Sequence, residues 1–570
     1  MPHANAAPIS LSCEYKENPL GIEMPLPRLS WKLPPGQRGQ LQTAYQVLVA
    51  SSEEKVNADT GDLWDSGKVE SDQSILVPYA GKKLSSRDRA WWKVRVWDRN
   101  GEVSAYSAPA WWETGLLSPA DWQAQWITLP GADHTEPGPA PYLRRVFTID
   151  KPIRQARVYA SAHGLYRLFV NGELASDDRF LPGWTEYNKR VQYQTFDITE
   201  LLTQGRNAAG MIVGDGWYVG PLGWTDRYMR YGNRPAALAQ IEIEYADGSR
   251  ETIASDSSWK ASTGPVLANG LFAGETYDAR LEIPGWNRVA FDDTAWAAAQ
   301  IEPLGDIPLV ASAGPAVRVF EELPARSVSE PQPGVFIFDI GQNMVGWVRL
   351  KVAGNPGETI TLRHAEMLNP DGTLYTENLR TAKATDRYTL SSGGEETYEP
   401  IFTFHGFRYV EVTGCSTKPE LGAVTGIVAH SATPVTGLFE CSSPLLNQLQ
   451  HNIVWGQKGN FLEVPTDCPQ RDERLGWMGD AQIFVRTACF NMDTAAFFTK
   501  WMVDVEDAQS EEGGFADVSP RIVDLSDGAP AWGDAGVIVV DRQGRLGHAR
   551  SSAHMSCAWS DEFGKIWSDI

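Results

Sequence analysis

Apolar and polar residues alternate along most of the chain up to about residue 435, and this alternation is the period of a β-strand. Residues 42–50 and 90–97 show the pattern most clearly, and turn sequences such as Asp98-Arg99-Asn100-Gly101 separate one apolar run from the next. Short strands at such spacing are typical of β-sandwiches, in which one face of each strand is buried. The first 435 residues are therefore predicted to be β throughout.

Composition divides this β region into parts. Residues 8–118 predict a small sandwich of the fibronectin III or immunoglobulin type. Residues 119–141 are rich in Pro and Gly and predict a linker. A second β domain is predicted over residues 142–308, where Asn171-Gly172 marks a hairpin turn, and a third, again a sandwich, over residues 309–435.

The pattern changes to a helical period in residues 436–539. Pro444 in a first turn predicts the start of a helix, whose buried face would carry the apolar residues at 445, 446, 449 and 453. Further helices are predicted at about 481–490 and 494–506. The chain thus predicts several β-sandwiches followed by the opening of an all-α domain.

Composition and charge exclude some partners. The formal net charge is −22 and the pI about 4.9, which argues against nucleic acid and anionic membrane as ligands. The 22 tryptophans suit stacking on sugar rings, although most are expected in the sandwich cores. The six cysteines have no paired or metal-ligand spacing, and no signal peptide or transmembrane stretch is apparent. A soluble, cytoplasmic protein is expected.

The densest chemistry lies in residues 467–482. Acidic residues stand at 467, 472, 473 and 480, beside two arginines and Trp477. If the stretch after Pro469 is helical, Glu473, Trp477 and Asp480 share one face. An acid among other acids, next to an aromatic ring, suits protonation of a leaving group and binding of a sugar, because the pKa values of neighbouring acids are pushed apart. The alternative is a solvated ion-pair network.

Two glycines in the same stretch favour a binding site over that alternative. Gly476 and Gly479 would each cost a helix about 1 kcal/mol relative to Ala. Close approach of a ligand would explain why they are there.

These residues resemble those of the bacterial α-L-rhamnosidases of glycoside hydrolase family seventy-eight. The resemblance runs in order from about residue 10 to about 539, and the motif at 467–482 is its most specific part. Other matching sequences are Gly21–Trp31, Val170-Asn171-Gly172, Pro182-Gly183-Trp184-Thr185, Gly214–Tyr218 and Phe404–Tyr409.

The resemblance implies an inverting hydrolase that removes terminal α-L-rhamnose, with an accessory jelly roll at 142–308 and catalysis in an (α/α)6 barrel. It assigns Glu473 as the general acid. Residues that would hold the sugar are Asp467, Arg471, Trp477, Asp480 and Trp532. Rhamnose-containing glycosides are the implied partners, and no cofactor is required.

Inversion also needs a general base, a carboxylate roughly 6.5–9.5 Å from the acid. In the family this base is a glutamate far downstream of the motif, and a twelve-helix barrel needs on the order of 300 residues. Residues 436–539 therefore predict only the first part of the barrel, and little or no turnover. Residues 540–570 lack a helical period and are expected to be an aberrant tail, for which we hypothesise a shifted reading frame; the alternative is a divergent but genuine C-terminal segment.

Two other functions are compatible with the sequence. One is a non-catalytic carbohydrate-binding protein that uses the 142–308 domain, where Asp177, Asp178 and Asp215 could offer oxygen ligands to calcium, although no complete ligand set is apparent. The other is an (α/α)6 glycosidase for a different sugar.

Overall fold

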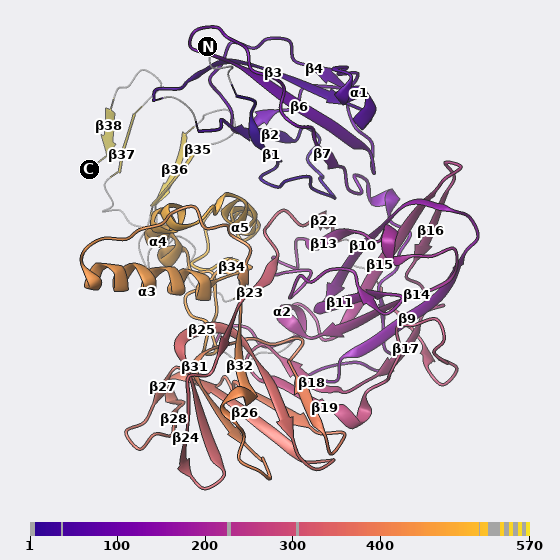
Figure 1. Cartoon of the computed structure of the whole chain (residues 1–570), viewed down its shortest axis with the longest axis vertical. Coiled ribbons are helices and arrows are strands. Elements are labelled where there is room, and N and C mark those ends of the chain that lie inside the picture. The colour runs from indigo at the N-terminus through magenta and orange to yellow at the C-terminus, as the bar shows by residue number, and fades with distance from the viewer. Residues whose placement is uncertain are drawn as a thin grey trace.

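The computed structural model describes residues 6–35, 38–224, 230–303, 307–511 and 513–522, and the backbone of four short strands after residue 535. In Figure 1 the N-terminal sandwich lies at the top, the second β domain at the right, the third at the bottom and the helices at the left. The predicted order, β domains followed by a few helices, is confirmed.

The N-terminal sandwich packs a three-stranded sheet against a four-stranded one. Three fully buried tryptophans, Trp31, Trp92 and Trp112, fill the space between the sheets, with alternate strand residues facing inward. The sheets are β1(Ile9–Cys13)-β2(Arg28–Lys32)-β5(Val77–Pro78) and β4(Trp64–Asp65)-β3(Gln42–Ala50)-β6(Arg89–Asp98)-β7(Ala110–Glu113); the helix α1 covers Glu53–Asn57.

The second domain is a jelly roll of two mostly antiparallel sheets. One is β21(Gln300–Ile301)-β8(Ile127–Thr128)-β15(Ala236–Tyr245)-β10(Ile153–His163)-β13(Val191–Asp197)-β22(Leu309–Ala311), with β16(Arg250–Ala254) beside β15. The other is β12(Glu173–Leu174)-β11(Leu165–Val170)-β14(Gly205–Gly214)-β9(Pro141–Ile149)-β17(Lys260–Thr263)-β20(Ala297–Ala298). The short helix α2 covers Gly216–Val219.

The linker predicted at 119–141 is more than a connection, because it supplies strand β8 to the jelly roll. Ile127 pairs with Ala237 of β15 and with Ile301 of β21, and Trp126 beside it is buried. Its Pro and Gly residues fall outside the strand.

The third domain is built on a ten-stranded sheet. Its order is β18(Val266–Gly270)-β19(Gly274–Asp278)-β29(Thr385–Thr389)-β26(Thr359–Ala365)-β31(His405–Thr413)-β25(Val335–Ala353)-β32(Val424–Ser431)-β23(Val317–Pro324), with β24(Ser327–Gln332) and β30(Glu395–Tyr398) on β25. A small hairpin joins β27(Met367–Leu368) and β28(Leu374–Tyr375).

The boundary predicted at 308/309 does not separate these two sheets. The hairpin β18–β19 lies before it in sequence but joins the third domain, where β19 pairs in parallel with β29. Conversely β22 lies after it but pairs in parallel with β13 of the jelly roll. Both pairings join residues far apart in the chain, so alternation along the sequence gives no sign of them.

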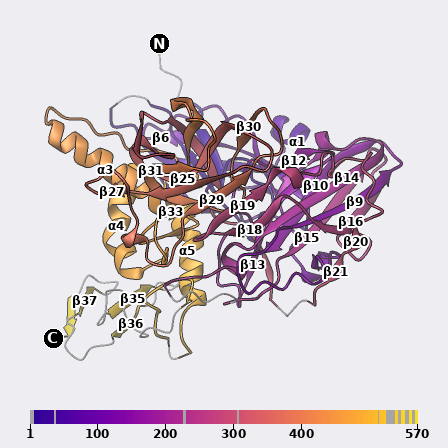
Figure 2. The same ribbon diagram turned by 90° about the horizontal axis from the view of Figure 1, so that it is seen from below.

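Three helices follow the sandwiches: α3(Pro444–Asn460), α4(Met478–Asn491) and α5(Ala495–Asp507). A short hairpin connects α3 to the segment before α4. Its two strands, β33(Phe461–Leu462) and β34(Val464–Pro465), have two residues each. Helix α3 packs on β25 and β32, and Figure 2 shows the helices gathered at one side of the sheets. No helix among the described residues has the length and apolarity to cross a membrane.

The buried face predicted for α3 is wrong. Leu445, Leu446 and Leu449 are exposed, and Leu445 keeps 78% of its accessible surface. The helix instead buries Gln457 and Gly459 near its end, where it meets the sheet. The apolar stripe is real, but no described segment covers it.

Beyond α5 the four strands pair as two hairpins, β35(Gly536–Val540) with β36(Leu546–Arg550) and β37(Cys557–Ser560) with β38(Ile566–Asp569). The first strand begins at Gly536, before the tail predicted from residue 540, and the shifted reading frame stays a hypothesis.

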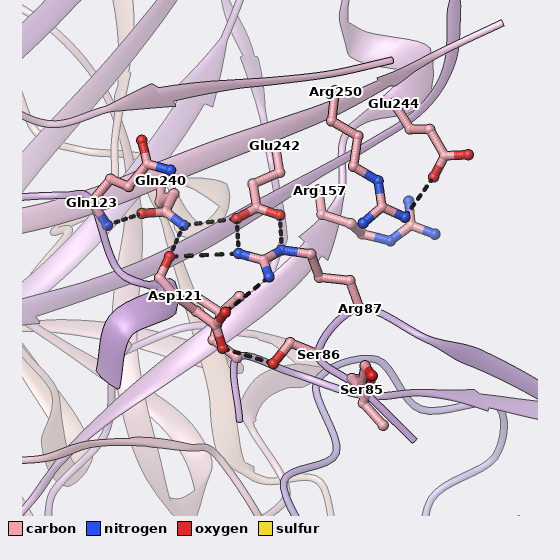
Figure 3. A network of polar contacts seen from close by, with 12 residues as sticks. Ser85, Ser86, Arg87, Asp121, Gln123, Arg157, Gln240, Glu242, Glu244 and Arg250 are labelled. Carbon is pink, nitrogen blue, oxygen red and sulfur yellow. Dashed lines mark hydrogen bonds and ion pairs between the residues drawn. The ribbon is translucent and has the colours of Figure 1, made fainter. Parts of the chain in front are cut away.

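Charged side chains join the domains. Arg87 of the N-terminal sandwich pairs with Glu242 of β15 and with Asp121, at 3.2 Å in the second case (Figure 3). On the helical side, Arg190 of the jelly roll pairs with Asp504 and Asp507 of α5. One continuous apolar core also runs through the jelly roll, the third domain and the helices, so the parts form a single packed body.

Candidate active site

The acidic motif lies on a loop, which corrects the helix predicted after Pro469. The chain is irregular from Thr466 to Trp477, and α4 begins only at Met478. The loop closes on itself, because the Asp467 N–H donates to the Leu475 carbonyl at 3.0 Å and the Leu475 N–H donates back to Asp467 Oδ1 at 2.9 Å. Arg474 takes a positive φ of 54° at the tight turn.

Glu473 is nevertheless beside Trp477, as the helical prediction required. The indole Nε1–H of Trp477 donates to Glu473 Oε1 at 3.1 Å. The other oxygen, Oε2, accepts from Arg471 Nε at 3.0 Å and from an Arg380 nitrogen at 2.8 Å. Glu473 is buried, and each of its two carboxyl oxygens accepts at least one hydrogen bond, so the orientation of the carboxyl group is fixed.

Arg471 links two of the acids. Its guanidinium donates to Glu473 and, through Nη2, to Asp467 Oδ2 at 3.2 Å. Burial raises the pKa of the Asp467 carboxyl, and the charge of Glu473 raises it further. The pKa of Asp480 is also raised, first by partial burial and then by Glu473. Asp480, in the first turn of α4, is the exposed member of the group.

Arg380 belongs to this site, although nothing in the local sequence pointed to it. It lies in the third domain, directly after the turn Glu377–Leu379, with a positive φ of 56°. Its guanidinium contacts both Glu473 and Asp472, and the Thr381 hydroxyl donates to Asp472 Oδ2 at 2.6 Å. Asp472 is therefore a buried anchor for the loop, not a member of the open site.

Arg474 holds the loop from below. It is buried, donates to the carbonyls of Leu271 and Phe404 at 3.0 and 2.9 Å, and lies over the rings of Phe272 and Phe404. Burial lowers its pKa to about 10. These contacts hold the loop against the third domain.

Close packing of the chain, and not a ligand, explains the glycine at position 476. This corrects the prediction that a ligand approaches it closely. A Cβ at this position would lie 2.2 Å from the Ser519 carbonyl oxygen and 3.0 Å from Trp501 Nε1. The segment around Ser519 runs so close that only glycine fits.

Trp477 stacks on a second indole, that of Trp224 from the jelly roll. Their ring centroids are 6.0 Å apart and the ring planes differ by 6°. Trp224 was not predicted as a site residue. One side of the site is therefore formed by an accessory domain.

A cavity of about 510 Å³ opens next to the acids, between α3 and α4. Asp467 and Asp480 stand at its edge, and most of its walls are apolar. Its lining includes Ile453, Phe461, Ile483 and Phe498.

Two groups of side chains in the described part of the chain have atoms close enough to share a metal ion. Asp467, Cys468 and Glu473 form one, but the cation Arg471 already lies between its two carboxylates. His364, Asp386 and His405 form the other, fully buried. Its imidazoles are stacked at 4.2 Å with planes 20° apart, so their in-plane lone pairs do not converge on one point. Neither group suits an ion in this arrangement.

Three further predictions concern residues away from the motif. Trp532 lies outside the described residues. Asp215 is buried with Oδ1 at 2.7 Å from His134 Nδ1, and Asp178 pairs with Arg318 at 2.7 Å. These two carboxylates have partners within the protein, and calcium binding stays a prediction.

Known families cover the chain in consecutive blocks. A Rha78A-like N-terminal immunoglobulin domain matches residues 8–118, and the α-L-rhamnosidase N-terminal domain matches residues 151–321. The bacterial α-L-rhamnosidase concanavalin-like domain matches residues 329–430, and the six-hairpin glycosidase domain of the same enzymes matches residues 434–543.

Individual relatives agree with these blocks. An α-L-rhamnosidase of Streptomyces avermitilis is 41% identical over 93% of this chain and 68% of its own length. One of Formosa agariphila is 42% identical over 92% of this chain and 58% of its own. The chain thus spans between about half and two thirds of its curated relatives.

Solved structures share the fold. The Streptomyces avermitilis enzyme complexed with L-rhamnose superposes with a TM-score of 0.88 at 40% identity, covering 91% of this chain and 67% of that one. The α-L-rhamnosidase of Dictyoglumus thermophilum gives 0.88 at 41%, covering 93% and 60%. With its domains matched in order and its relatives this similar, the chain belongs to the α-L-rhamnosidases of glycoside hydrolase family seventy-eight.

Proposed function

We propose that this chain carries the sugar-binding and proton-donating half of a site that hydrolyses terminal α-L-rhamnosides with inversion. The fixed position of the Glu473 carboxyl is the observation that supports it, because one oxygen accepts from Trp477 and the other from two arginines, next to Asp467 at the edge of the cavity. In the reaction, Glu473 gives its proton to the glycosidic oxygen as the C1–O bond breaks. Asp467, Arg471 and Asp480 bind the sugar hydroxyls, and Trp477 meets an apolar part of the ring.

The base that inversion requires is a separate carboxylate. Asp467 is a poor candidate, because its oxygen lies within 4.8 Å of the Glu473 oxygen, whereas inverting pairs stand roughly 6.5–9.5 Å apart to admit a water molecule. Asp467 is also bound to Arg471 and to the Leu475 N–H. Asp467 is therefore not expected to activate the water, and in the family that this chain belongs to the base lies downstream of the motif.

For a polypeptide of residues 1–570 alone, we therefore expect binding of L-rhamnose with little or no turnover of an aryl α-L-rhamnoside. The rate should be at least roughly 10²–10⁴-fold below that of a full-length relative, because the loss for one missing base alone has that size. Calorimetric titration with L-rhamnose and a parallel hydrolysis assay measure the two. Turnover equal to that of a relative, or no rhamnose binding, would contradict the proposal.

Variants separate the roles. Arg471→Ala is expected to weaken rhamnose binding about tenfold or more, because it removes a forked donor and leaves Asp467 and Glu473 facing each other. Glu506→Gln, at an exposed acid on α5, serves as the matched control and should leave binding unchanged. Equal effects of the two changes would mean that the motif does not bind the sugar.

A further inference from the structure

Trp224 is the most exposed tryptophan among the described residues, with 36% of its surface accessible. Large aromatic side chains are usually placed in the core, and an indole left partly open beside a candidate site indicates a surface for binding. Its only ring partner among the described side chains is Trp477. One part of its apolar surface is thus covered, and the rest faces outward.

The backbone around Trp224 is anchored on the motif side. Leu222, two residues before, is buried in the core that the jelly roll shares with the helices. Arg230, after it in the same connection, donates to the Arg521 carbonyl at 3.0 Å. The Arg521 N–H in turn donates to Glu186 of the jelly roll at 3.1 Å. Both contacts tie the jelly roll to the segment around residue 521.

That segment is itself bound to the motif. The Met478 N–H donates to the Asp517 carbonyl at 2.9 Å, and the Ser519 N–H donates to the Gly476 carbonyl at 2.9 Å. Val518 pairs with Trp477 in an isolated bridge. Trp477 is thus held by backbone contacts to residues 517–519, and Trp224 follows the buried Leu222 in the chain.

The position of this wall relative to the acid suggests what it binds. Trp477 donates to Glu473 Oε1, so Trp224 lies one side chain beyond a direct partner of the proton donor. A general acid faces the glycosidic oxygen, and the group on the far side of that oxygen is the aglycone. Asp467 and Asp480, which we assign to the rhamnose, stand at the cavity between α3 and α4. Trp477, assigned to the same ring, lies between Glu473 and Trp224, so Trp224 is placed beyond the residues that meet the rhamnose.

We propose that Trp224 is a specificity-determining residue that binds the aglycone of the substrate through a flat apolar face. Such a face is offered by the aromatic ring of an aryl rhamnoside and by the apolar side of a second sugar ring. This inference rests on the rhamnosidase function proposed above and adds to it the part of the substrate that the jelly roll would select.

Binding titrations of the 570-residue chain test it with three ligands: L-rhamnose, 4-nitrophenyl α-L-rhamnoside and a disaccharide of rhamnose linked to glucose. Trp224→Ala should weaken binding of the ligand with the matching aglycone roughly 2- to 12-fold, the range for one aromatic contact, while the affinity for free rhamnose changes less than twofold. Loss for the aryl ligand alone assigns an aromatic aglycone, and loss for the disaccharide assigns a sugar.

Two further variants keep the result interpretable. Trp224→Phe retains a flat ring and should recover most of the lost affinity, and Trp97→Ala, in the N-terminal sandwich, should leave all three ligands unaffected. Thermal unfolding of each variant checks that the fold is kept. Equal weakening of all three ligands by Trp224→Ala, or no weakening of any, overturns the inference while the proposed function stands. If the unaltered chain binds none of the ligands, both are overturned.

Discussion

The carboxyl group of Glu275, in strand β19, is buried in the third domain. Its oxygens accept from the Tyr398 hydroxyl at 3.2 Å and from the N–H groups of Ile401 and Phe402 at 3.0 and 3.3 Å. Burial raises the pKa of Glu275 to about 8, with Asp386 contributing in the same direction. Folded protein therefore retains this proton at pH values where unfolded protein, with a carboxyl pKa near 4.5, has lost it.

The sign of the effect on stability follows directly. The stabilisation is complete below pH 4.5 and is lost as pH rises towards 8, so Glu275→Gln, which cannot ionise, should flatten that decline. We expect the variant to match the unaltered protein at pH 5 and to exceed it by roughly 2–4 kcal/mol at pH 9 in urea unfolding. The exposed Glu395→Gln should follow the unaltered protein at both pH values. A constant difference between Glu275→Gln and the unaltered protein would contradict the assignment.

At the scale of residues, the motif allowed much of the site to be predicted. The structure brings together Asp467, Arg471, Glu473 and Trp477, because all four lie on one short loop and their types suit one another. Arg380 and Trp224 could not be predicted, since each arrives from another domain through long-range packing. Asp472 precedes Glu473 directly in the sequence, but its side chain points away from the open site and binds Arg380.

At the scale of elements, α3 illustrates what an apolar stripe does and does not predict. The helix begins at Pro444 as its sequence indicates, yet its leucines face outward. Period and capping are local properties and can be predicted from sequence. Burial needs a partner surface, and the sequence of one helix carries no record of it.

The exposed stripe gives a prediction for the element. Replacing Leu445, Leu446 and Leu449 together by Gln should reduce binding of a hydrophobic dye and self-association, with a melting temperature within about 3 °C of the unaltered protein, because little buried area is lost. The matched contrast is Leu475→Gln at a fully buried position, which should destabilise by about 3 kcal/mol or more. A large drop in stability for the triple variant would show that the stripe is covered in solution.

At the scale of the whole molecule, the domains are joined through buried charge. Glu113 of β7 is almost fully buried and accepts from Arg89 in its own sandwich and from Arg157 of β10 in the jelly roll, at 2.7 and 2.8 Å. Nearby, Glu244 pairs with Arg250 at a more open position (Figure 3). Because Glu113 is the more buried of the two, its replacement is expected to lower the stability of the fold more than replacement of Glu244.

Glu113→Gln should therefore loosen the N-terminal sandwich from the rest. It removes the carboxylate partner of Arg89 and the more buried of the two carboxylate partners of Arg157, which still pairs with Asp197 at 2.9 Å. Breaking a buried pair costs about 3–5 kcal/mol when no counter-charge remains, so a cost at the lower end of that range is expected. Calorimetry should resolve a separate, earlier unfolding step for the sandwich, and limited proteolysis should cut between residues 114 and 126. Glu244→Gln is the control, and there the single transition should be retained. A single unshifted transition for Glu113→Gln would mean that the interface does not depend on this carboxylate.

The order of domains could be predicted along the chain, because each has its own periodicity. Their mutual packing could not. The hairpin β18–β19 joins the sheet of the next domain, and β8 enters the jelly roll from a segment rich in turn residues. Such exchanges depend on which edges remain open once each sheet has formed.

The reach of Arg380 across a domain border also limits how genes of this kind can be rearranged. A recombination event that joined these helices to a foreign β-sandwich would separate the arginine from the carboxylates of Asp472 and Glu473. In such a chimaera the buried carboxylate of Asp472 would have lost its guanidinium partner. We therefore expect the third domain and the helical segment to be inherited as one block. Chimaeras made in the laboratory should also keep these two parts together.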